Sequence, residues 1–130
     1  MIGKLIPEAL AQAITAEAMR HEADPVRQAQ VLNVLAAANY NVNEIAELAG
    51  TTWHEIEMTI GLLALIDLGK DALDRGLLYV SLARHIAQLS EANQNVVLIR
   101  WIRGDFKSEA HATRYVQALI EDEGTVLGLN

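Results

Sequence analysis

The fold is decided by residues 43–65, NEIAELAGTTWHEIEMTIGLLAL. Its first part, Glu44–Ala49, carries enough small apolar side chains for one packed helix face. Gly50 follows, the residue type that best tolerates the left-handed backbone of a helix end. Thr52 and Glu55 then match the Thr-x-x-Glu capping box that opens a new helix. A short helix, a tight turn with a glycine and a longer helix together form the helix-turn-helix pattern.

The second helix of this pattern has two apolar sides. Residues at three- and four-residue spacing share one face, which predicts a common packed side for Trp53, Ile56, Ile60 and Leu63. We expect Trp53, and Trp101 later in the chain, to be anchored in the core. The other side either packs under later helices or forms an exposed patch for a partner protein, and it consists of Met58, Leu62 and Leu65. Gly61 inside this helix suggests close approach of another helix or a ligand.

Composition places the chain in the all-α class. Its 130 residues are enough for one ordinary domain with its own core, and helix formers dominate. We expect a multi-helix domain with a helix-turn-helix at about residues 43–66 and a C-terminal helical subdomain. The chain has no cysteine and no apolar run of ~18 residues, and its first ten residues, MIGKLIPEAL, lack the long apolar segment of a secretory signal. These features favour a cytoplasmic protein without a membrane partner.

Caps and breakers predict the remaining helices. Pro7 opens a first helix, and Asp24 caps a second that begins at Pro25. Asn39–Asn41 ends this second helix near Ala38, since Asn favours turns. The other expected helices span residues 70–75, 79–89, 90–103 and 108–122, with serine caps at Ser90 and Ser108.

Charge is distributed unevenly along the chain. The formal net charge of −7 argues against a uniformly phosphate-binding surface. Residues 75–114 nevertheless contain six basic side chains against the acids Glu91, Asp105 and Glu109, and these bases are Arg75, Arg84, Arg100, Arg103, Lys107 and Arg114. The basic part therefore follows the helix-turn-helix.

No catalytic set of residues is evident, so we do not expect an enzyme. His54 and Glu57 share one helix face, but the sequence offers no third metal ligand and no HExxH motif. The glycines form no phosphate loop, and no serine has a nucleophile-elbow context. We therefore predict no catalytic residue, no metal site and no cofactor.

Several segments, in order, resemble one known family. DPVRQA (24–29) resembles the Asn-Pro-(Ile/Leu)-Glu-Glu-Ala helix start of ParB-type partition proteins, a group that includes KorB-like plasmid regulators. EIAELAG (44–50) is similar to the family's Glu-(Ile/Leu)-Ala-x-x-(Val/Leu)-Gly helix, and TIGLLAL (59–65) to its Thr-Leu-Arg-Leu-Leu-x-Leu stretch. GLLYVSLAR (76–84) resembles its Gly-x-(Leu/Ile)-Ser-x-Gly-His-Ala-Arg segment, and residues 108–119 its closing helix.

The resemblance implies a domain plan and a function. Residues 16–22 look like the segment that closes the family's N-terminal nucleotide-binding domain, whose earlier motifs are absent here. The plan is thus an N-terminal segment at 1–24, a ParB-like helix-turn-helix domain at 25–122 and a tail at 123–130. It suggests a fragment or a stand-alone relative without nucleotide hydrolysis. The implied function is binding of double-stranded DNA in plasmid partition or chromosome segregation.

This sequence departs from the family on the exposed side of the reading helix. There the family has basic and polar residues, whereas this chain has Thr51, Trp53, Met58 and Gly61, with Glu55 and Glu57 beside them. No Arg, Lys, Asn or Gln, the usual base readers, occurs between residues 51 and 65.

Two hypotheses follow. In the first, the chain binds duplex DNA, with Thr51, Thr52 and His54 as near contacts and three arginines of later helices on phosphates, namely Arg84, Arg100 and Arg103. In the second, the helix-turn-helix fold is kept but serves self-association or binding of a partner protein, through Met58, Leu62 and Leu65.

Overall fold

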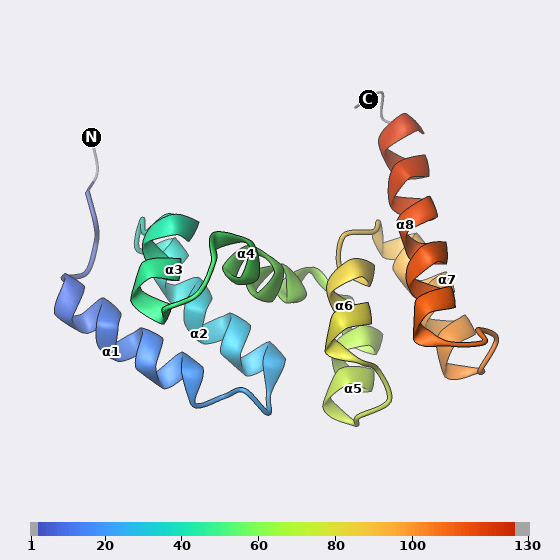
Figure 1. Ribbon diagram of the computed structural model, residues 1–130, viewed down its shortest axis with the longest axis horizontal. Helices are drawn as coiled ribbons and strands as arrows, with labels where there is room; N and C mark the ends of the chain where they lie inside the picture. Colours follow the sequence, from blue (N-terminus) through green and yellow to red (C-terminus); the bar gives the residue numbers. More distant parts are fainter. Residues whose placement is uncertain (1–2, 127–130) are drawn as a thin grey trace. The chain divides into compact units, whose positions relative to one another are not determined.

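The protein is all-helical, as predicted. The computed structural model describes residues 3–126, which contain helices and no strand (Figure 1). None of these helices combines the length and the apolar character needed to cross a bilayer. The chain divides after Leu63 into two compact units, here called unit 1 (residues 3–63) and unit 2 (residues 64–126). Unit 1 holds α1 (Glu8–Met19), α2 (Pro25–Ala37), α3 (Val42–Ala49) and α4 (Trp53–Gly61); after the 3-10 turn η1 (Leu62–Ala64), unit 2 holds α5 (Asp67–Asp74), α6 (Val80–Ile86), α7 (Glu91–Ile102) and α8 (Glu109–Val126).

Side chains at the starts of α2 and α3 satisfy free backbone donors there. Asp24 accepts a hydrogen bond from the backbone N–H of Arg27 at 3.2 Å, and Pro25 occupies the first position of α2, as predicted. Asn41 opens α3 with a reciprocal pair of bonds that the sequence analysis missed. Its side chain accepts from the Glu44 N–H at 2.9 Å, and the Glu44 carboxylate accepts from the Asn41 N–H at 3.0 Å.

Unit 1 has one core that includes the N-terminal helix. Helix α1 packs on α2 and α3, and α2 packs on α3 and α4. Residues 3–24 thus belong to the same compact unit as the helix-turn-helix, because α1 buries its apolar side against α2 and α3. The core consists of Ala11, Ala18, Leu32, Leu35, Ala38, Tyr40, Ile45, Ala46 and Ile56.

Unit 2 is built from α5–α8. Helix α8 packs on α6 and α7, and α5 packs on both α6 and α7. Ser90 accepts a hydrogen bond from the N–H of Asn93 at 3.3 Å, and Ser108 accepts one from the N–H of His111 at 3.1 Å. The two predicted serine caps are thus confirmed.

Two helix ends differ from the expectation. The helix that opens at Thr52 was expected to reach Ile66, but α4 ends at Gly61 and the chain continues as the 3-10 turn η1. Helix α8 was expected to end at Asp122 and to be followed by a tail, but it continues to Val126, while residues 127–130 of the predicted tail lie outside the described residues. A tertiary contact explains the extra turn, since the Glu123 carboxylate accepts a hydrogen bond from the Ser90 N–H at 3.0 Å.

Candidate nucleic-acid interface

The turn between α3 and α4 has the glycine end and the Thr52 cap that its sequence predicts. Gly50 ends α3 in the left-handed conformation, with φ at 69°, and the Thr51 N–H donates to the Ala46 carbonyl at 3.0 Å. Thr52 has extended backbone, and its hydroxyl accepts a hydrogen bond from the Glu55 N–H at 3.1 Å. Two helices are thereby joined by three residues, which is the helix-turn-helix motif.

Helix α4 packs on unit 1 through one side only. Ile56 and Thr59 are buried, with exposed fractions of 1% and 4%, and the Thr59 hydroxyl donates to the Glu55 carbonyl at 2.8 Å. The opposite side of the helix and the preceding turn are exposed, and this outward surface consists of Thr51, Thr52, Trp53, His54, Glu57 and Gly61. We call these six residues the outward surface of α4. It brings together three of the predicted DNA contacts, namely Thr51, Thr52 and His54.

Trp53 belongs to this outward surface, and its predicted place in the core is wrong. Its side chain is 52% exposed, and its ring meets the ring of His54 edge-on at a centroid distance of 5.6 Å. Spacing along the helix places Trp53 near Ile56, but it cannot show whether a neighbouring helix reaches the first turn. Trp101 differs, since it is half-buried and donates from Nε1 to the Leu77 carbonyl at 2.8 Å.

The apolar side proposed for a partner protein is not available as a patch. Leu62 is fully buried and Leu65 is 3% exposed, while Met58 is half-buried. These side chains belong to the protein interior, because leucine side chains gain most when water is removed from them. No other helix approaches Gly61 closely, since a Cβ added there would have no heavy atom within 4 Å.

The outward surface of α4 carries a negative charge rather than a positive one. Glu57 is exposed, and no hydrogen bond or ion pair engages its carboxylate among the described residues. Elsewhere in unit 1, Lys4 forms an ion pair with Glu44 at 2.6 Å, and Arg20 forms one with Glu17 at 3.2 Å. Charge attraction to phosphates by unit 1 is therefore limited.

The predicted phosphate contacts lie in unit 2. Arg100 and Arg103, at the end of α7, both form ion pairs with Asp105. The Arg100 guanidinium also contacts two aromatic rings, because its carbon lies 4.9 Å from the ring centroids of both Phe106 and Tyr115. The hydrogen bond from Arg103 lowers the pKa of the Asp105 carboxyl below its usual value of 3.8, so Asp105 is charged at neutral pH.

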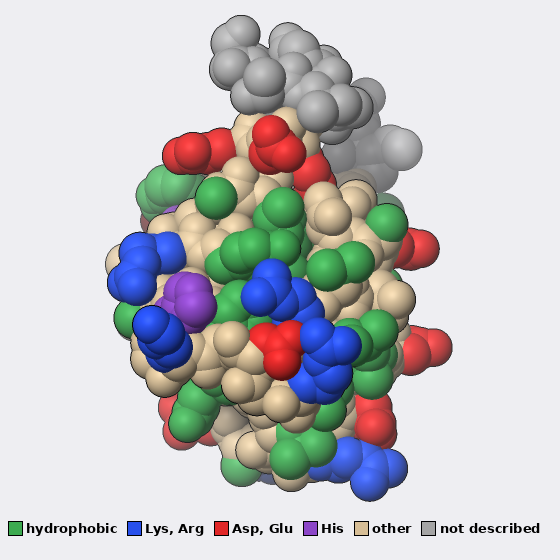
Figure 2. All heavy atoms as spheres, turned by 90° about the vertical axis from the view of Figure 1, so that its right-hand side faces the viewer, with side chains coloured by type: hydrophobic (Ala, Val, Ile, Leu, Met, Phe, Trp, Pro, Cys, Tyr) green, Lys and Arg blue, Asp and Glu red, His purple; other side chains and the backbone are tan. Residues whose placement is uncertain are grey.

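The two arginines of α7 differ in availability. The Arg103 side chain is 63% exposed, whereas that of Arg100 is 35% exposed and is held by the rings. Arg84, in the last turn of α6, is half-buried. On the face of the molecule drawn in Figure 2, Lys and Arg side chains are spread out, with a histidine and an acidic side chain among them. Arg103 is thus the best placed of the three to meet an external anion.

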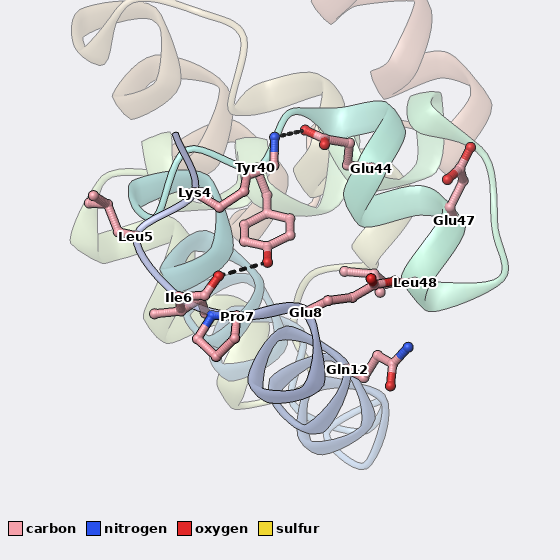
Figure 3. A pocket seen from close by; sticks show the side chains of 10 residues that line it. All are labelled: Lys4, Leu5, Ile6, Pro7, Glu8, Gln12, Tyr40, Glu44, Glu47 and Leu48. Carbon is pink, nitrogen blue, oxygen red and sulfur yellow. Dashed lines mark hydrogen bonds and ion pairs between the residues drawn. The ribbon is translucent and has the colours of Figure 1, made fainter. Parts of the chain in front are cut away.

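One groove in unit 1 is large enough for a small ligand. It has a volume of about 850 Å³ and lies between the N-terminal segment, α1 and α3 (Figure 3). Lys4 and Glu44 form their ion pair at its edge, and the Tyr40 hydroxyl donates to the Ile6 carbonyl at 2.9 Å. Glu8 and Glu47 add further carboxylates. No group of three or more metal-binding side chains occurs here or elsewhere in the described chain.

The fold is similar to that of a known DNA-binding domain. The crystal structure of the DNA-binding domain of the chromosome-partitioning protein ParB, complexed to the centromeric parS site, superposes with a TM-score of 0.73. The superposition covers 86% of this chain and 91% of that chain, with 23% sequence identity. No protein-family model and no curated protein matches this sequence. The similarity confirms the predicted ParB-like helix-turn-helix fold.

Proposed function

We propose that this protein binds double-stranded DNA through its helix-turn-helix, as the DNA-binding domain of a plasmid or chromosome partition or regulatory protein. The observation that carries the proposal is the outward surface of α4, which is presented by a helix-turn-helix inside a ParB-like fold. In DNA-binding versions of this motif the second helix enters the major groove and its first residues contact base edges. Such a protein would act in the cytoplasm.

The near contacts in this proposal come from the start of α4. Thr51 and Thr52 offer hydroxyl groups, and His54 offers ring nitrogens, all of which can hydrogen-bond phosphates or base edges. Trp53 adds an exposed ring that can make apolar contact with a thymine methyl group. The Thr52 hydroxyl already accepts one hydrogen bond from the Glu55 N–H, so it keeps its O–H donor and one acceptor lone pair for DNA.

In unit 2, Arg84, Arg100 and Arg103 are the proposed phosphate contacts. Since the net charge of the chain is −7, we expect weak binding that falls steeply as salt is added. Each arginine that neutralises a phosphate should raise the steepness of this salt dependence by roughly one.

The deciding experiment is fluorescence anisotropy at low salt with labelled duplexes of random sequence and a single-stranded control. We expect the duplex to bind, and we expect His54→Ala to weaken binding by about tenfold, which corresponds to about 1.4 kcal/mol. Asn33→Ala, an exposed change on α2, serves as the matched control and should leave binding unchanged. If no duplex is bound at low salt, the proposal is wrong.

A further inference from the structure

Helix α7 exposes an apolar stripe on its outer side. Val96, Ile99 and Ile102 are 47%, 42% and 49% exposed, although Gln94, Val97 and Leu98 on the other side of the same helix are buried. Single exposed aliphatic side chains are ordinary on protein surfaces, but three within two turns of one helix face form a continuous strip. We call these three residues the α7 stripe.

Opposite charges stand at the two ends of the α7 stripe. Glu91, exposed, is the first residue of the helix, and Arg103, exposed, follows its last residue. Arg100 and Arg103 share the single carboxylate of Asp105, so the C-terminal end keeps an excess of one positive charge. Ala92, exposed and small, leaves room for another helix beside the stripe.

This pattern is complementary to itself when the helix is reversed. In a two-fold symmetric pair the same patch serves both copies, so residue i meets residue j and j meets i. If two α7 helices pack antiparallel about an axis midway between Val96 and Ile99, each Val96 meets Ile99 of the second copy. The same register brings Glu91 near Arg103 of the second copy, and Ala92 near Ile102.

We propose that the α7 stripe is an interface through which two copies of this chain associate, with their α7 helices antiparallel. The opposite charges at the two ends of the helix favour a second, antiparallel copy of α7 as the partner. A parallel pair would set Glu91 against Glu91 and Arg103 against Arg103. Three aliphatic side chains cover less than the ~800 Å² per partner of a standard stable interface. The dimer therefore forms at high protein concentration and dissociates on dilution. This association requires no DNA, although Arg103 is also one of the proposed phosphate contacts.

Sedimentation equilibrium over a wide concentration range tests the interface. We expect the wild-type chain to shift from monomer to dimer, and Ile99→Asp to weaken dimerisation by at least about tenfold, since a carboxylate would be buried in an apolar contact. Val34→Asp is the matched control, because Val34 is an exposed aliphatic residue of α2, at 50% exposure. A wild-type chain that stays monomeric at every concentration overturns the proposal.

A charge exchange tests the orientation. Glu91→Arg alone and Arg103→Glu alone should each weaken the dimer, because each sets like charges against one another. The double variant should restore it, while circular dichroism checks that α7 remains helical in all three. If the double variant is no better than the single ones, the antiparallel register is wrong.

Cross-linking gives an independent measurement, since the chain has no cysteine. In the antiparallel register, two copies of residue 96 are offset by about 4–5 Å along the helix axis and two copies of residue 92 by about 16 Å, from the rise per residue. A short bis-maleimide should therefore join Val96→Cys chains and not Ala92→Cys chains. Efficient cross-linking of Ala92→Cys chains would contradict the register.

Discussion

Gln94 of α7 caps the start of α5, since its Oε1 atom accepts a hydrogen bond from the backbone N–H of Ile66 at 2.9 Å. The residue at this helix start, Ile66, has no side chain that could do so itself. The Gln94 amide also donates to the carbonyl oxygens of Ala64 and Leu89, at 3.1 and 3.0 Å. A side chain that is 1% exposed thus satisfies three backbone groups from two separate segments of unit 2.

Replacing Gln94 should destabilise unit 2. Gln94→Met keeps the length and shape of the side chain but leaves the Ile66 N–H and two carbonyl oxygens without their partner. We expect a loss of about 2–3 kcal/mol in the free energy of unfolding, because unsatisfied buried polar groups are costly. Urea denaturation followed by circular dichroism measures this. Gln117→Met, the same replacement at an exposed position of α8, should change stability by less than about 0.5 kcal/mol.

The capping box of α3 should make the stability of unit 1 depend on pH. Hydrogen bonding to the Asn41 N–H, and then to Lys4, lowers the pKa of Glu44 below its usual value of 4.5. A lowered folded-state pKa stabilises the fold above pH 4.5, and this stabilisation is lost as the pH falls through the folded-state value.

Thermal unfolding of Glu44→Gln measures that contribution. The melting temperature of this variant should lie below that of the wild type at pH 6, and the difference should shrink as the pH is lowered past 4.5. Glu47→Gln, an acid-to-amide change on the same helix, is the control. A difference between Glu44→Gln and wild type that is the same at pH 6 and in acid would contradict the assignment.

The exposure of Trp53 predicts that it contributes little to stability. Trp53→Ala should alter the free energy of unfolding far less than Ile56→Ala, which removes a side chain that is 1% exposed and should cost about 2–5 kcal/mol. Denaturation curves of both variants give the comparison. A loss of several kcal/mol for Trp53→Ala would mean that its ring is packed in the core after all.

Glu57 should weaken DNA binding and at the same time make it more selective for base sequence. Its carboxylate repels phosphates, so Glu57→Gln should bind random duplexes about fivefold more tightly, the factor that corresponds to roughly 1 kcal/mol between unit charges in water. A carboxylate can accept a hydrogen bond from the amino group of cytosine, so selection from a random duplex pool should show a cytosine preference that this variant loses.

Glu22→Gln provides the control for that measurement. It makes the same change of charge at an exposed acid between α1 and α2, outside the helix-turn-helix. If both variants bind equally more tightly, the effect is one of net charge, and Glu57 has no special position toward DNA.

The sequence alone determined the helix-turn-helix and most helix starts. Thr52, Ser90, Ser108 and the Asp24–Pro25 pair act on backbone groups within one turn of themselves, so their effect can be predicted from spacing. The ordered resemblance to ParB-type proteins rests on the same local patterns, and the fold confirms it. The selection of Thr51, Thr52, His54, Arg84, Arg100 and Arg103 as DNA contacts stays a prediction.

Only the tertiary structure decided which apolar and charged side chains face outward. Periodicity groups Trp53 with Ile56 on α4, but the burial of the first turn depends on residues distant in sequence, and Trp53 stays exposed. Leu62 and Leu65 are buried, and Lys4 forms its ion pair with the distant Glu44, for the same reason. Capping acts within a few residues, and periodicity describes the faces of a single helix. Burial and ion pairing between distant segments depend on how whole helices pack, and the order of residues along one helix does not specify that packing.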